Sequence, residues 1–134
     1  MIKTFDLVYL IDDDLKFSFI TKTLLSKISF AKEIVDYSDA GEALNELKKN
    51  TQNGGGKLPD IIFLDLNMPV MDGWEFLEEY KSLPASFRNG CKLYVLTSSI
   101  DPVDKTRSKA YPFVTDFISK PLARERVNWI QENN

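Results

Sequence analysis

The 134 residues carry a formal net charge of -3, with 43% hydrophobic and 28% charged side chains, which is typical of one globular domain with a full core. No stretch is rich in Lys and Arg, no apolar run is long enough to span a membrane, and residues 1–10 lack the features of a signal peptide. We therefore expect a cytoplasmic protein that binds neither nucleic acid nor membrane.

The chain contains no histidine. This absence excludes a Ser-His-Asp hydrolase, a zinc site with histidine ligands and any role as a histidine phosphodonor. The single cysteine, Cys91, cannot form an internal disulfide, and we expect it to open a buried strand as a small hydrophobic residue.

Hydrophobic periodicity predicts strands and helices in alternation, with caps and turn residues between them. The predicted strands are Asp6–Ile11, Glu33–Tyr37, Ile61–Leu64, Lys92–Leu96 and Asp116–Ile118, and the predicted helices are Leu15–Lys27, Ser38 or Asp39 to Asn50, Trp74–Lys81, Pro102–Ala110 and Leu122–Gln131. Thr51–Lys57, which contains three consecutive glycines, is predicted as a flexible loop, and Ala85–Gly90 as a polar connection. Five strands alternating with five helices indicate a doubly wound α/β fold with a parallel sheet.

The third strand, Ile61–Leu64, is an unbroken apolar run that ends in a single carboxylate, Asp65. An apolar run without polar alternation is typical of a central parallel strand covered by helices on both faces. In such sheets the ligand crevice lies beyond the carboxyl ends of the strands. Asp65 is therefore a candidate for chemistry.

Polar residues also follow three of the other strands: Asp12 and Asp13 the first, Thr97 the fourth and Lys120 the last. In a parallel sheet these ends share one edge, so three carboxylates, a hydroxyl and an ammonium should converge there. Carboxylates that close repel one another unless a cation lies among them. Hard oxygen ligands of this kind favour Mg²⁺ with a phosphoryl group.

Four segments in this order and spacing resemble the receiver domain of two-component response regulators. They are IDDD at Ile11–Asp14, FLDLNMPVMDG at Phe63–Gly73, LTSS at Leu96–Ser99 and ISKPL at Ile118–Leu122. The resemblance covers essentially the whole chain and implies a flavodoxin-like sheet of strand order 2-1-3-4-5. It also implies a stand-alone receiver, residues 1–134, without an output domain, that is a monomer or a weak dimer.

The resemblance implies a role for each matching residue. Asp65 would accept a phosphoryl group from the phosphohistidine of a sensor histidine kinase or a histidine phosphotransfer protein. Asp13 and Asp65 would bind Mg²⁺ directly, Asp12 through water, and the backbone carbonyl of Asn67 would complete the protein ligands. Thr97 and Lys120 would bind phosphoryl oxygens, and the Lys120–Pro121 bond would be cis. The protein would be a phosphoacceptor rather than an enzyme.

Phosphorylation would then act on a downstream partner through Thr97 and an aromatic switch, here Phe117. Phe117 lacks a hydroxyl, so we expect a weaker switch or one based on packing alone. The partner face would include Lys109, Phe117 and Arg124. Asn67 and Ser99 would tune hydrolysis of the phosphoryl group. The segment Tyr111–Thr115 departs from the family pattern, and we expect its proline to end the fourth helix and its aromatics to enlarge the partner face.

Other functions remain to be weighed against this one. A Mg²⁺-dependent phosphohydrolase usually has a second acid two residues after its Asp nucleophile, and this chain has Asn67 there. A flavin-binding protein would need a phosphate loop rich in Ser, Thr and Gly after the first strand, where the acidic triplet lies. The remaining alternative is a degenerate receiver that acts as a scaffold without phosphorylation.

Overall fold

The computed structural model describes residues 2–54, 56–98 and 101–134, in which strands and helices alternate. The strands are β1 (Phe5–Ile11), β2 (Ala31–Tyr37), β3 (Ile61–Leu64), β4 (Lys92–Thr97) and β5 (Val114–Ser119). The helices are α1 (Leu15–Lys27), α2 (Ala40–Asn53), α3 (Gly73–Tyr80), α4 (Ala85–Arg88), α5 (Pro102–Ser108) and α6 (Arg124–Glu132).

The five strands form one parallel sheet in the order β2-β1-β3-β4-β5, which confirms the predicted doubly wound, flavodoxin-like fold. Successive side chains of a strand point to opposite faces, and here both faces are apolar. Val8 and Leu10 of β1 belong to one buried cluster, whereas Tyr9 and Ile11 belong to the other. A strand with two apolar faces needs helices on both sides.

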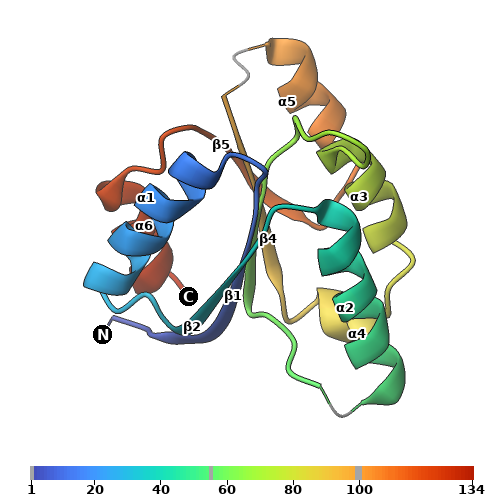
Figure 1. Cartoon of the computed structure of the whole chain (residues 1–134), viewed down its shortest axis with the longest axis horizontal. Helices are drawn as coiled ribbons and strands as arrows, with labels where there is room; N and C mark the ends of the chain where they lie inside the picture. The colour runs from blue at the N-terminus through green and yellow to red at the C-terminus, as the bar shows by residue number, and fades with distance from the viewer. Residues whose placement is uncertain (1, 55, 99–100) are drawn as a thin grey trace.

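Helices supply that cover in two layers (Figure 1). α1 and α6 lie on one face, where Leu25, Val127 and Ile130 join the cluster containing Val8. α2 and α3 lie on the other face, with Leu44 and Phe76 among their buried side chains. Because every strand is parallel, all five carboxyl ends lie at the same edge of the sheet.

The prediction of five helices was wrong, because the described residues contain six. The additional helix, α4, occupies the segment predicted as a polar connection. Its one large apolar side chain, Phe87, is buried against Tyr80, with the two ring centroids 5.9 Å apart. A single apolar residue in a short polar stretch gives no helical periodicity, so the tertiary contact that stabilises α4 is invisible in the sequence.

Other helix ends also differ from the prediction, most notably the ends of α2 and α5. α2 continues through Asn53, so part of the predicted loop Thr51–Lys57 is helical, and α2 ends where Gly54 adopts a left-handed φ of 66°. The hydroxyl of Thr51 donates to the Leu47 carbonyl inside the helix. α5 ends at Ser108 rather than at Ala110, so Pro112 does not terminate it.

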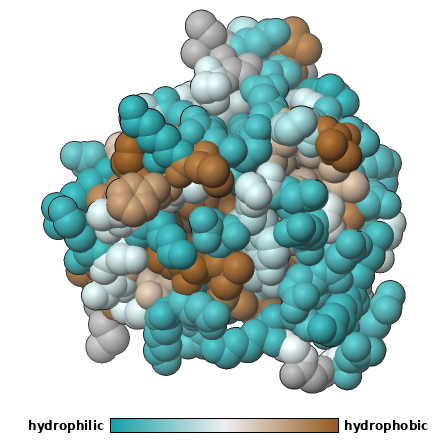
Figure 2. Space-filling model, in the orientation of Figure 1, coloured by the Kyte–Doolittle hydropathy of each residue, from teal (hydrophilic) through white to brown (hydrophobic). Residues whose placement is uncertain are grey.

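None of the helices within the described ranges is long and apolar enough to cross a membrane. Figure 2 shows a surface that is mainly hydrophilic, with hydrophobic side chains gathered over the half that carries α1. The exposed apolar residues of α1 are Leu15, Phe19 and Ile20.

Candidate functional site

The end of β1 places two carboxylates in different environments. Asp12 is 2% exposed, and its backbone N–H donates to the Tyr37 carbonyl of β2, whereas Asp13 is exposed. The third acid, Asp14, caps α1: its side chain accepts from the Phe17 N–H at 3.1 Å. The Asp14 N–H in turn donates to Asp12 Oδ1 at 2.9 Å. The helix cap therefore fixes the orientation of the buried Asp12 carboxylate.

The end of β3 brings Asp65 beside these acids. Its backbone N–H donates to the Ile11 carbonyl at 2.9 Å, and its side chain is buried. Asp12, Asp13 and Asp65 each offer a carboxylate oxygen, and these three oxygens lie within 4.8 Å of one another. The sheet register thus assembles the predicted acidic cluster.

The connection after Asp65 is held close to the sheet by Gly73, the first residue of α3. The Gly73 N–H donates to the Leu66 carbonyl at 3.0 Å. A Cβ at position 73 would lie 2.5 Å from the Asp65 carbonyl oxygen and 2.6 Å from Leu66 Cα. Only glycine allows this approach, so Gly73 fixes the backbone that carries the candidate nucleophile.

Lys120 brings the positive charge to the cluster. Its backbone N–H donates to the Thr97 carbonyl at 2.8 Å, and the Lys120–Pro121 peptide bond is cis, the isomer that the family resemblance implies. The Lys120 Nζ lies 2.6 Å from Asp12 Oδ2 and 3.7 Å from Asp65 Oδ2, and the side chain is only 14% exposed. One ammonium is therefore shared by two buried carboxylates.

The other predicted residues differ in burial and in position. Thr97, the last residue of β4, is fully buried at the same sheet edge. Asn67 is exposed in the connection that follows Asp65. Phe117 is half-buried in β5, beside Val95 of β4, and packs against the core on the α2–α3 side. Ser99, predicted to tune hydrolysis, lies outside the described residues.

The charges at the site are unevenly balanced. Burial, and secondarily the charge of Asp12, raises the pKa of Asp65 from 3.8 to about 6, although the Lys120 ammonium and a backbone hydrogen bond from Asn67 oppose this shift. Asp65 Oδ1 is buried and accepts no hydrogen bond from the described residues. A buried carboxylate oxygen without a hydrogen-bond donor is costly to keep in its charged form. A hard divalent cation would relieve that cost, so the donor set fits Mg²⁺.

One residue at this site was not among the predicted functional residues. Phe17, which lies within the predicted helix Leu15–Lys27, has its ring centroid 4.1 Å from Lys120 Nζ. The ring is half-buried, with its other contacts in the α1–α6 cluster. Helical periodicity says which face a residue occupies but not which distant lysine reaches it, so no sequence signal could have identified this contact.

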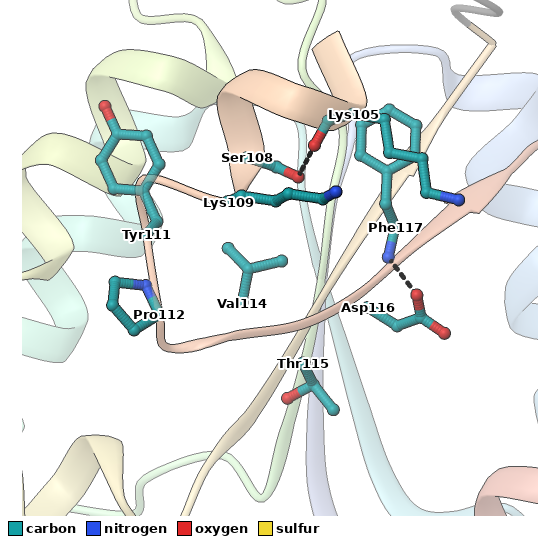
Figure 3. A pocket seen from close by; sticks show the side chains of 9 residues that line it. All are labelled: Lys105, Ser108, Lys109, Tyr111, Pro112, Val114, Thr115, Asp116 and Phe117. Atoms are coloured by element: carbon teal, nitrogen blue, oxygen red, sulfur yellow. Dashed lines mark hydrogen bonds between the residues drawn. The ribbon is translucent and has the colours of Figure 1, made fainter. Parts of the chain in front are cut away.

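A groove also lies between α5 and β5, away from the acidic cluster (Figure 3). Its volume is about 300 Å³, and Figure 3 shows the Lys105, Lys109 and Phe117 side chains around it. Tyr111 contributes to the same lining, but its hydroxyl donates to Glu78 Oε2 of α3 at 2.9 Å. Tyr111 and Phe113 also pack against the core beside α3. The sequence had suggested that these two aromatics project outward and enlarge the partner face. They lie instead against α3.

Comparison with known proteins agrees with this geometry. The family model of the response regulator receiver domain matches residues 8–130. The chemotaxis protein CheY of Bacillus subtilis is 24% identical over 120 residues, which cover 90% of this chain and 89% of that protein. The sensor histidine kinase CheAY of Helicobacter pylori is 35% identical over 80 residues, which are 60% of this chain but only 9% of the kinase.

Among solved structures, a two-component response regulator from Cytophaga hutchinsonii superposes with a TM-score of 0.86 and 30% identity. The match covers 98% of this chain and 97% of that one. With the family model matched over almost the whole chain, and with an acidic pocket at the carboxyl edge of the sheet, this chain belongs to the response regulator receiver domain family of two-component signalling.

Proposed function

We propose that this receiver is a phosphoacceptor of a two-component phosphorelay and that Asp65 takes its phosphoryl group from a phosphohistidine. The donor would be a sensor histidine kinase or a histidine phosphotransfer protein. The observation that carries the proposal is the buried Asp65 carboxylate, which has two other carboxylates within 4.8 Å and the Lys120 ammonium at 3.7 Å. The role is that of a signalling phosphoacceptor rather than an enzyme acting on a separate substrate.

Asp65 is suited to be the nucleophile. With a pKa of about 6 it is mainly ionised at neutral pH, and its Oδ1 has no hydrogen bond among the described residues to occupy its lone pairs. In the transfer, a bond forms between a carboxylate oxygen and phosphorus while the bond from phosphorus to the donor imidazole nitrogen breaks. The bonding pair returns to that nitrogen. The chain's main task is to hold and neutralise charge, because the transition state is loose.

The neutralising groups are already close to Asp65. Asp12, Asp13, Asp65 and the backbone carbonyl of Asn67 would hold Mg²⁺, which offsets the charge of the phosphoryl oxygens when bound. Lys120 would move from Asp12 toward a phosphoryl oxygen. The Thr97 hydroxyl would donate to another. Groups of fixed orientation in a buried site stabilise developing charge better than water does.

The signal would leave the molecule through α5, β5 and α6. Attraction of Thr97 to the phosphoryl group would change the packing of Phe117, whose strand is paired with β4 at Val95. Phe117 lines the groove of Figure 3, so its rotation would reshape that groove for a downstream protein. Lys109 lies in the same lining, and Arg124 begins α6.

The test is intact mass measured after incubation with a small-molecule phosphodonor, with and without Mg²⁺. We expect one added phosphoryl group in the wild-type chain when Mg²⁺ is present, and none with Asp65→Asn. No addition under any condition, together with no Mg²⁺ binding, would instead support a scaffold that works without phosphorylation.

A further inference from the structure

The Lys120 ammonium contacts two carboxylates and one aromatic ring. Its Nζ lies 2.6 Å from Asp12 Oδ2 and 3.7 Å from Asp65 Oδ2. It also lies over the face of the Phe17 ring, 4.1 Å from the ring centroid. An ammonium this close to an aromatic face is attracted by the ring quadrupole, most strongly where water is excluded. The lysine side chain is only 14% exposed, so the contact is partly desolvated.

Phe17 is fixed by the same turn that orients Asp12. The Asp14 N–H donates to Asp12 Oδ1, and the Phe17 N–H donates to Asp14 Oδ1, at 2.9 and 3.1 Å. Together with the Lys120 contacts, these bonds form a closed ring of contacts that links Asp12, Asp14, Phe17 and Lys120. The backbone that carries the ring is therefore tied to the carboxylate that Lys120 pairs with.

We propose that Phe17 is a positioning residue that holds the Lys120 ammonium against Asp12, at the mouth of the metal and phosphoryl site. The inference on phosphoryl transfer rests on the function proposed above, whereas the inference on metal binding needs only the acidic cluster. Held by the ring, the ammonium competes with a divalent cation for the Asp12 oxygen. It also stays close enough to reach an incoming phosphoryl oxygen.

Loss of the ring should change the Mg²⁺ affinity and the phosphorylation rate in opposite directions. Without the ring, the ammonium is better hydrated and more mobile, so Asp12 is freer to bind Mg²⁺ and the affinity for Mg²⁺ rises. Phosphoryl transfer slows, because the ammonium must then be ordered during the reaction. General damage to the packing around α1 would instead weaken Mg²⁺ binding and slow transfer together.

The experiment compares Phe17→Leu, which removes the ring but keeps an apolar side chain, with Phe17→Tyr, which keeps the ring. The control is Phe19→Leu, because Phe19 is on the same helix and 73% exposed. Backbone amide shifts in an NMR titration with Mg²⁺ alone give the affinity, and intact mass against time gives the phosphorylation rate from a small-molecule phosphodonor. With Phe17→Leu we expect Mg²⁺ affinity to rise and the rate to fall, each by roughly two- to tenfold, whereas Phe17→Tyr and Phe19→Leu should match the wild type.

A second comparison uses Lys120→Met, in which the proposed partner of the ring is missing. In that background, Phe17→Leu should leave Mg²⁺ affinity unchanged. The proposal is overturned if Phe17→Leu weakens Mg²⁺ binding, or if its effect persists without the lysine. If the wild type accepts no phosphoryl group, the proposed function fails, and the Mg²⁺ titrations still decide the role of Phe17.

Discussion

Two aspartates lie at opposite ends of the third strand, and their carboxylates differ in how many hydrogen bonds they accept. Asp60, just before β3, has a backbone N–H that donates to the Leu7 carbonyl at 2.9 Å. Its Oδ2 accepts from the Asp6 N–H at 2.8 Å and from the Leu7 N–H at 3.4 Å. This carboxylate joins the starts of two neighbouring strands, and its charge is well supplied with donors.

The carboxylate of Asp65, just after β3, has fewer hydrogen-bond donors. Its side chain is 5% exposed, and its Oδ1 accepts no hydrogen bond from the described residues. Its nearest charged neighbours include two other acids. The same residue type is thus stabilising at one end of the strand and costly at the other. A buried acid kept at a cost to stability is a physical indication of function, whereas a satisfied one is explained by structure alone.

The largest effect should come from Asp65→Asn, which keeps the side-chain shape but removes the nucleophilic charge. We expect no phosphorylation by intact mass, at a time when the wild type is fully modified. Circular dichroism should show an unchanged fold. Phosphorylation of this variant would mean that another residue accepts the group.

Lys120→Met should come next, because it removes the ammonium beside both buried carboxylates. The phosphorylation rate should fall roughly 100- to 1,000-fold, the usual cost of losing one group that stabilises a transition state. Residual phosphorylation should no longer change binding of a downstream partner. A rate within a few-fold of the wild type would remove Lys120 from the mechanism.

The cost of charging Asp65 should appear in the pH dependence of stability of the metal-free protein. The folded state keeps the Asp65 proton to a pKa of about 6, compared with 3.8 as the usual value. Between these pH values the native state binds more protons than the unfolded state, so the free energy of unfolding falls as pH rises. The fall should be on the order of 3 kcal/mol, since one pKa unit corresponds to about 1.4 kcal/mol.

Urea denaturation in EDTA across this pH range measures that fall. Asp65→Asn should lack it and should be more stable than the wild type at neutral pH. Equal pH dependence in the two proteins would show that Asp65 does not carry the cost.

Asp60→Ala should have the smallest effect. It should lower the stability of the fold, whereas Asp65→Asn should raise it. Loss of the acceptor for two backbone N–H groups should destabilise the fold by about 1–2 kcal/mol in urea denaturation, with phosphorylation retained. Asp60→Asn, which keeps an acceptor oxygen, is the matched control and should lose less. A loss of phosphorylation in a folded Asp60→Ala protein would contradict the contrast between the two strand ends.

Much of this organisation is predictable from the sequence. Buried parallel strands have continuous apolar runs, and the polar residue after each run marks the edge where the strand ends. That pattern was enough to bring together Asp12, Asp13, Asp65 and Lys120, which the structure places in contact or close to it. Asp39, one of the two residues predicted for the start of the second helix, caps α2, because capping depends on local chemistry.

What the sequence did not reveal depends on contacts between distant segments. The helix α4 is stabilised by Phe87 packing against Tyr80, and the ring of Phe17 meets a lysine from the far end of the chain. The different burial of Asp12 and Asp13, adjacent in the sequence, follows from which side of the strand end each occupies. The role of Phe117 as a switch, and action without an output domain, stay predictions.

The most direct test of the central claim is to locate the phosphoryl group within the chain. Borohydride reduction after treatment with a phosphodonor and Mg²⁺ converts an aspartyl phosphate to homoserine, which peptide mass spectrometry can assign to one residue. We predict homoserine at position 65, dependent on Mg²⁺, with Asp60 unmodified. Homoserine at position 12 or 13 instead, or a phosphorylated chain with no homoserine at position 65, would contradict the assignment of Asp65 as the phosphoacceptor.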